Sequence, residues 1–338
     1  MSAAARRAFL IPSIISLLLL AFVWSALGVV AFGTAILLVV LEVTLSFDNA
    51  IVNAGILKRM NHFWRVQFLL WGIIFAVVVT RLLLPILIVA AGVSASPLYI
   101  AQLALNDPKH YGELLESAKY GINAFGALFL LMVSLKYFFN KEKQLHWIAS
   151  IEERLSKWGS IEAIEIALAL LVLFLSAFFV PEHQAQILFA GVLGIFIFIV
   201  AHGITALFDK RKDSGESGFA LFAYLCMLDV AFSLDSVIGA FALSTDLLVI
   251  MIGLGIGAYF VRAFTVYMVD NGTLERIKYI EQGAHWAILG LAVVMIAGLF
   301  VSVPEPLTGF IGLSFIVGAY ISSARSAVSK TSVINTQL

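Results

Sequence analysis

Long apolar runs follow one another along almost the whole chain, and each is about as long as the roughly 20 residues that a helix needs to cross a bilayer. Soluble domains do not contain so many, and the composition agrees, with 62% hydrophobic and only 12% charged residues among 338. The sequence therefore predicts an all-α fold, a polytopic membrane bundle of about ten transmembrane helices. The predicted segments are 9–27, 31–57, 64–92, 121–139, 161–180, 185–208, 218–243, 247–270, 284–303 and 306–325.

Lysine and arginine are divided very unevenly between the two sets of loops that these segments define. With the N-terminus in the cytoplasm, seventeen basic residues fall inside and only Lys109 and Lys119 fall outside. Because cytoplasmic loops of membrane proteins are enriched in basic residues, we expect both termini to be cytoplasmic. The net charge is zero and no basic tail is present, so we expect the lipid bilayer rather than nucleic acid as a partner. A homo-oligomer is left open.

Two acid-bearing motifs interrupt the apolar runs, EVTLSFDN at residues 42–49 and DVAFSLDS at residues 229–236. An ionisable side chain at bilayer depth costs roughly 2.5–3.5 kcal/mol on insertion scales, so paired acids in a membrane helix indicate a function. The motifs share one register. Three pairs of positions are each separated by 187 residues: Glu42 and Asp229, Ser46 and Ser233, and Asp48 and Asp235.

The two motifs lie on segments that are predicted to cross the membrane in opposite directions. This arrangement is typical of inverted-repeat transporters, in which the substrate site lies near the midplane where the repeats meet. The chain then divides into a first half, 1–208, and a second half, 209–338, within one membrane unit. Counting the helical rise from the shared loop places Arg81 at the depth of Glu42 and Arg262 at the depth of Asp229. We interpret both arginines as internal counter-charges.

Carboxylate, amide and hydroxyl oxygens without histidine or cysteine are ligands for Mg²⁺, Ca²⁺ or Mn²⁺. Four acids and two arginines leave a formal charge of −2, which one divalent cation would neutralise. Asp48 and Asp235 lie about 120° away from the other motif residues on an ideal helix, so they join one site only if the helix unwinds or the other repeat approaches. No permanently bound cofactor is expected. The candidate metal ligands are Glu42, Ser46, Asp48, Asn49, Asp229, Ser233, Asp235 and Ser236.

At the first motif the chain resembles the TerC-type integral membrane family, whose signature is an acid followed by Ser-x-Asp-Asn in a membrane helix. That family is similar to cation exporters of the LysE-type superfamily, and some members are linked to manganese efflux or tellurite resistance. The resemblance implies a protein of the bacterial cytoplasmic membrane that exports a divalent cation, with Mn²⁺ favoured. It also implies that Glu42, Asp48, Asn49, Asp229 and Asp235 bind the ion.

Two other functions remain as alternatives. Asp48 and Asp235 on separate helices could form the pair of an intramembrane aspartyl protease, although the contexts Phe-Asp-Asn and Leu-Asp-Ser differ from those of such enzymes. The chain could also be a partner that transports nothing, within a membrane complex that responds to tellurite or metal stress. We favour the transporter, without enzymatic activity, because each aspartate has an extra acid six residues upstream that such a protease does not require, and nothing in the loops supports the partner. A set of intramembrane salt bridges that only fixes helix packing is less favoured as well, because packing does not require the same constellation twice in opposed orientation.

Overall fold

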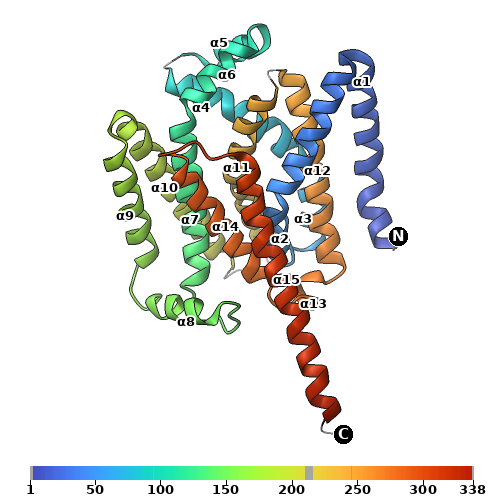
Figure 1. Ribbon diagram of the computed structural model, residues 1–338, viewed down its shortest axis with the longest axis vertical. Helices are drawn as coiled ribbons and strands as arrows, with labels where there is room; N and C mark the ends of the chain where they lie inside the picture. Colours follow the sequence, from blue (N-terminus) through green and yellow to red (C-terminus); the bar gives the residue numbers. More distant parts are fainter. Residues whose placement is uncertain (1–2, 94, 210–215, 245, 337–338) are drawn as a thin grey trace.

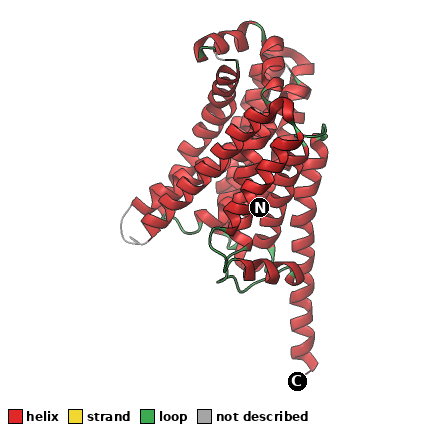
Figure 2. Cartoon of the chain, turned by 90° about the vertical axis from the view of Figure 1, so that its left-hand side faces the viewer, coloured by secondary structure: helices red, strands yellow, loops and turns green. Residues whose placement is uncertain are grey.

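The computed structural model describes residues 3–93, 95–209, 216–244 and 246–336, and no strand occurs among them. Helices fill the body of the molecule, and short loops join them (Figure 2). This confirms the all-α bundle. In chain order the elements are α1 (Ala3–Leu45), α2 (Phe47–Leu57), α3 (His62–Ile74), the π-helix η1 (Phe75–Leu83), α4 (Leu84–Gly92), α5 (Pro97–Asn106), α6 (Pro108–Ser117), α7 (Lys119–Phe138), α8 (Ala149–Trp158), α9 (Ile164–Phe179), the short 3-10 helix η2 (Pro181–His183), α10 (Gln184–Asp209), α11 (Glu216–Leu243), α12 (Leu247–Asp270), α13 (Thr273–Arg276), α14 (Ile280–Ala297) and α15 (Glu305–Thr336).

Seven helices of the described chain are long and apolar enough to cross a membrane, and α9 and the Gly218–Ser233 part of α11 are apolar but shorter. The sequence predicts about ten. The difference arises partly because α1 counts once although it folds back on itself at Gly28 (Figure 1). Gly28 has φ +90°, a conformation that only glycine adopts without strain. The first predicted segment and most of the second therefore form the two arms of one helical hairpin.

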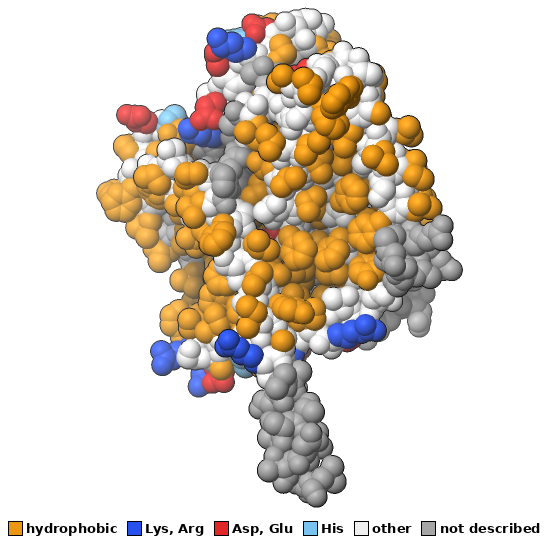
Figure 3. All heavy atoms as spheres, turned by 45° about the vertical axis from the view of Figure 1, so that its right-hand side comes forward, with side chains coloured by type: hydrophobic (Ala, Val, Ile, Leu, Met, Phe, Trp, Pro, Cys, Tyr) orange, Lys and Arg blue, Asp and Glu red, His pale blue; other side chains and the backbone are white. Residues whose placement is uncertain are grey.

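The surface has the polarity of a membrane protein. Large apolar side chains point away from the bundle, with Val30 80% and Phe189 75% exposed. Figure 3 shows apolar side chains across the middle of one face and charged side chains gathered toward its two ends. A soluble monomer rarely exposes such a continuous apolar area, whereas a lipid-facing surface requires it.

The loops predicted to share one side of the membrane lie at one end of the bundle. Lys58 after α2 pairs with Glu275 on α13, and Lys278 donates to Ser326 on α15. Gln282 at the start of α14 donates to the carbonyl of Leu145, before α8. We call this end the α8 end, and the opposite end, which carries α5 and α6, the α5–α6 end (Figure 1). The relative placement of these loops agrees with the predicted topology.

The two motif helices run in opposite directions, as an inverted repeat requires. α2 ends at the α8 end, beside α13, whereas α11 begins near the α8 end and its Phe241 contacts Gly112 of α6 at the other end. Each half places an arginine-bearing helix next, η1 in the first and α12 in the second. The predicted link between the halves, Asp209–Gly218, lies mostly outside the described residues, because 210–215 are not described.

One predicted segment ends differently in the structure. The sequence predicts helix throughout 284–303, but α14 stops at Ala297 and a loop leads to α15 at Glu305. The loop is nearly as apolar as the helix, so Gly298, directly after Ala297, is the one weak stop signal before Pro304. The earlier end matters because the loop lines a cavity that is described below.

Glycines let α1 and α12 approach each other closely. A Cβ added at Gly253 would lie 2.6 Å from the Cβ of Leu38, and one at Gly257 would lie 2.6 Å from the Cβ and Cγ of Glu42. Small residues four apart are a common means of close packing between membrane helices. The spacing therefore sets the distance between Glu42 and the second half of the chain.

We predict that Gly257→Ala lowers the stability of the protein, because the new methyl group overlaps a side chain that is itself fixed in the interior. Overpacking of this kind costs about 1–3 kcal/mol. Gly33→Ala on α1 is the matched control, since nothing lies within 4 Å of its added Cβ. The measurement is thermal unfolding in mild detergent. Equal melting temperatures for the two variants would show that α12 moves aside without cost.

Candidate metal centre

The first motif lies at a break between two helices. α1 ends at Leu45, Ser46 has φ −99° and ψ 13°, and α2 begins at Phe47. The backbone N–H of Asn49 donates to Oδ1 of Asp48 at 2.9 Å, so a side chain supplies an acceptor within the first turn of α2. α11, in contrast, continues without a break through the second motif. Unwinding is one of the two ways in which the sequence allows Asp48 to join the site, and the structure has a break in the first repeat only.

Glu42 and Arg81 form a buried ion pair within the first repeat. Nη2 of Arg81 lies 2.5 Å from Oε1 of Glu42, and the hydroxyl of Ser46 donates to the same oxygen at 2.8 Å. Nη1 of Arg81 donates to the carbonyl of Ala76 at 2.6 Å, inside the π-helical segment. Glu42 and Arg81 are 1% and 3% exposed. Local π-helical turns are frequent at functional sites, and in this one the Ala76 carbonyl helps to orient the guanidinium.

The second repeat contains the matching pair, in which Nη2 of Arg262 contacts Oδ2 of Asp229. Each arginine thus pairs with the acid of its own repeat, an arrangement that agrees with the depths counted from the sequence. Arg262 also lies over the ring of Phe68, 5.4 Å from its centroid. The side-chain Nδ2 of Asn49 donates to Oδ1 of Asp229 at 3.4 Å, and this contact joins the two motifs across the repeat interface.

Asp48 occupies a different environment from the two paired acids. It is 4% exposed and has no ion pair among the described residues. Its carboxylate borders a cavity of about 10 Å³, which is roughly the space of a single water molecule or ion. The residues around this cavity come from α1, α2, α11, α14 and α15: Leu45, Asp48, Phe232, Ser236, Leu291, Thr308, Gly309 and Gly312.

The remaining predicted ligands are partly placed. Ser233 and Ser236 are buried on α11, and the hydroxyl of Ser236 donates to the carbonyl of Ser233 at 3.0 Å. Ser236 lines the Asp48 cavity, whereas no contact between the Ser233 side chain and a charged group is described. The side chain of Asp235 lies outside the described part of the structure. Among the described residues, no three acids, histidines or cysteines lie together as a ready metal cluster.

Several buried polar atoms around the motifs have no hydrogen-bond partner. Within the described chain they include Oε2 of Glu42, Oδ1 of Asn49 and Oδ1 of Asn53. Glu42 lies one turn before the break, and Asn49 and Asn53 lie one turn apart on α2. Buried acceptors are rarely left unpaired, so each one calls for an explanation such as a bound water or ion. All three are oxygens, the donor type that hard divalent cations select.

Sequence reasoning missed the contribution of α15. Thr308, Gly309 and Gly312 face the Asp48 cavity, and a Cβ added at Gly312 would lie 3.7 Å from Oδ2 of Asp48. Two glycines and a threonine at i, i+1 and i+4 are a weak signal of a small-residue helix face, and nothing in the sequence connects them with Asp48.

Comparisons with known proteins give one match. Residues 47–329 match the family described as "Protein of unknown function (DUF475)". The matched region begins after Glu42 and Ser46 and contains Asp48, Asn49, the second motif and both arginines. No curated protein and no solved structure matches the chain.

Proposed function

The chain belongs to the DUF475 family, and we propose that it is a membrane transporter that exports a divalent metal cation, with Mn²⁺ favoured, through the site between the two motifs. The observation that supports this most directly is the set of buried oxygens of Glu42, Asn49 and Asn53 that have no hydrogen-bond partner. The same motif also carries the buried carboxylate of Asp48, which has no ion pair among the described residues. A hard cation is the substrate that such oxygens coordinate. The resemblance of the first motif to TerC-type proteins points to the same substrate.

The paired arginines give the site a means of releasing its ion. Three described acids and two arginines leave a formal charge of −1 in the described site, and the predicted ligand Asp235 brings the total to −2. Arg81 and Arg262 form ion pairs with Glu42 and Asp229. A cation competes with them for these oxygens, which weakens binding enough for the ion to leave. Protons that exchange on the same carboxylates supply the driving force in this proposal.

Alternating access follows from the inverted repeat, because the two motif helices meet across the Asn49–Asp229 contact. A change in the angle between the repeats opens one side of this contact and closes the other. The basic residues of the α8 end support a cytoplasmic position for that end, with both termini inside a bacterial cell, as part of this proposal. Export then runs from the α8 end to the α5–α6 end.

Removing the unpaired Oδ1 of Asn53 should weaken metal binding without lowering the stability of the protein. We predict that Asn53→Leu weakens Mn²⁺ binding at least about tenfold, or ~1.4 kcal/mol, in isothermal titration of the purified protein. The melting temperature should stay equal or rise, because replacing an unsatisfied buried acceptor with an apolar group of similar shape is close to neutral. Asn53 is 2% exposed and its Oδ1 has no partner.

Ser134→Ala is the matched control for this experiment. Ser134 is also buried, but its hydroxyl donates to the carbonyl of Leu131 on α7, away from the motifs. We expect it to bind Mn²⁺ like the unaltered protein. Titrations of the unaltered protein with Ca²⁺ and Mg²⁺ rank the three ions by affinity. If the unaltered protein binds none of the three ions, the proposed function is wrong.

A further inference from the structure

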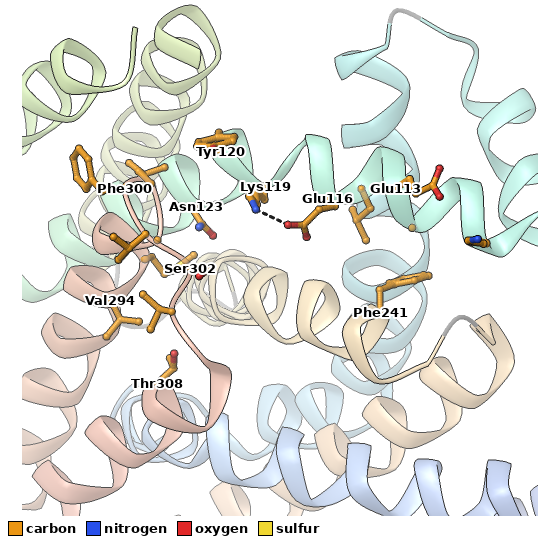
Figure 4. Close-up of a pocket in the computed structure, with 18 residues that line it drawn as sticks. Glu113, Glu116, Lys119, Tyr120, Asn123, Phe241, Val294, Phe300, Ser302 and Thr308 are labelled. Atoms are coloured by element: carbon orange, nitrogen blue, oxygen red, sulfur yellow. Dashed lines mark hydrogen bonds and ion pairs between the residues drawn. The ribbon is translucent and has the colours of Figure 1, made fainter. Parts of the chain in front are cut away.

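A large cavity opens at the α5–α6 end of the bundle. It has a volume of about 650 Å³ and lies between α6, α7, α11, α14 and the loop before α15. Its wall carries Asn123, Ser302 and the ion pair between Lys119 and Glu116, whose atoms are 2.5 Å apart. Figure 4 shows this pair and Asn123 on one side of the cavity and Thr308 on the other. Apolar side chains of α14 and of the following loop form much of the rest of the lining, so the lining is mixed, and its polar part offers water hydrogen-bond partners.

Thr308 connects this cavity with the Asp48 site. Its side chain borders both the large cavity and the small cavity around Asp48. α14 gives a second wall common to the two, because Met295 faces the large cavity and Leu291, one turn away, faces the small one. The two cavities therefore follow one another along α14 and α15, with the 7% exposed Thr308 between them.

Toward the α8 end the same helices are closely packed. Ala54 and Leu57 on α2 are fully buried, as are Ala284 and Ile288 on α14. Between these two α14 residues, Trp286 donates to the buried Glu152 of α8 at 2.8 Å, and Lys143 donates to the same carboxylate at 2.6 Å. Burial acts to raise the pKa of Glu152, but these hydrogen bonds outweigh it and hold the pKa below its usual value. The anchored α8 thus covers this end of α14.

We infer that the large cavity is an aqueous vestibule through which the cation bound at Asp48 exchanges with the solution at the α5–α6 end, and that Thr308 lines its narrowest point. The inference rests on the proposed function for the identity of the ion, while the route itself follows from the two adjoining cavities. The Lys119–Glu116 pair keeps the wall near neutral, so the negative charge at Asp48 dominates the field along the route. A negative charge at the inner end of an otherwise neutral cleft concentrates ions of the opposite sign there.

Cysteine labelling tests the route without relying on transport. Cys226 is the only cysteine and is buried, so a Cys226→Ala background is free of thiols. Thr308→Cys and Asn123→Cys in this background are treated in intact cells with membrane-impermeant cationic and anionic methanethiosulfonate reagents. We expect both positions to react from the α5–α6 side. Relative to Asn123→Cys, Thr308→Cys should favour the cationic reagent about tenfold, the lower end of such focusing effects.

Three further measurements make the outcome decisive. Adding Asp48→Asn should abolish the preference for the cationic reagent, and millimolar Mn²⁺ should slow labelling at Thr308→Cys but not at Asn123→Cys. Ala287→Cys, one turn from Leu291 toward the α8 end and fully buried, should not react. Leu291→Cys replaces Thr308→Cys if that variant does not fold.

If Asn123→Cys reacts but Thr308→Cys and Leu291→Cys are both protected, the vestibule does not reach the Asp48 cavity. This result would overturn the inference. Labelling of Thr308→Cys from the α8 side only would overturn it as well. Charge-selective labelling in a protein that transports no ion would support the route while refuting the proposed function, so the two failures are distinguishable.

Discussion

Vesicles that contain the Asp48→Asn protein should transport Mn²⁺ at least about tenfold more slowly than vesicles with the unaltered protein, a loss of ~1.4 kcal/mol or more. Asp48 is the one described acid of the two motifs that no arginine pairs, and it faces the cavity that adjoins the vestibule. Its carboxylate is therefore free to bind a cation. Asparagine keeps the size of the side chain and an oxygen that can accept from the backbone N–H of Asn49, but it lacks the negative charge.

The fold should tolerate this change. A buried carboxylate without an ion pair carries a desolvation cost that the neutral amide avoids, so we expect an unchanged or higher melting temperature. Asp270→Asn is the matched control, because Asp270 is an exposed carboxylate at the end of α12. It should transport normally. Full transport by Asp48→Asn, measured with a manganese-sensitive dye inside the vesicles, would remove Asp48 from the site.

The features that the sequence predicted correctly are those that follow from bilayer physics. Apolar length predicts the helices, and the depth of a charge along a helix predicts its partner, because no water is present to solvate an unpaired guanidinium. The pairing of Glu42 with Arg81 and of Asp229 with Arg262 therefore follows from the order of the residues along the chain. The opposite directions of α2 and α11 follow from the same counting.

Other features depend on packing and have no local signal. The break at Ser46 occurs without a proline or glycine, in a stretch whose residues suit an unbroken helix. The approach of α15 to Asp48 depends on Gly309 and Gly312, which give only a weak signal in the sequence. Ala297 ends α14 within an apolar run. Each of these positions lies next to the candidate site or the vestibule, where local preference and overall fold are expected to disagree.

Breaking the Glu42–Arg81 ion pair should lower the stability of the protein strongly. Removing one partner of a buried ion pair leaves an uncompensated charge and typically costs about 3–5 kcal/mol, so Glu42→Gln and Arg81→Met should each lower the melting temperature strongly. Both side chains are almost fully buried, and the guanidinium has only the Ala76 carbonyl and the Thr80 hydroxyl as other acceptors within the described chain. With both charges removed, the double variant should recover most of the stability.

Transport should not recover with stability. Under the proposed function Glu42 contributes an oxygen to the ion and Arg81 competes for it, so the double variant folds yet lacks both the ligand and its competitor. Glu275→Gln, which breaks the exposed pair with Lys58, is the control and should change stability little because water screens that pair. If the double variant regained stability and also transported Mn²⁺ normally, the Glu42–Arg81 pair would stabilise helix packing but would not take part in transport. The ion would then have to be held by Asp48 and the asparagines alone.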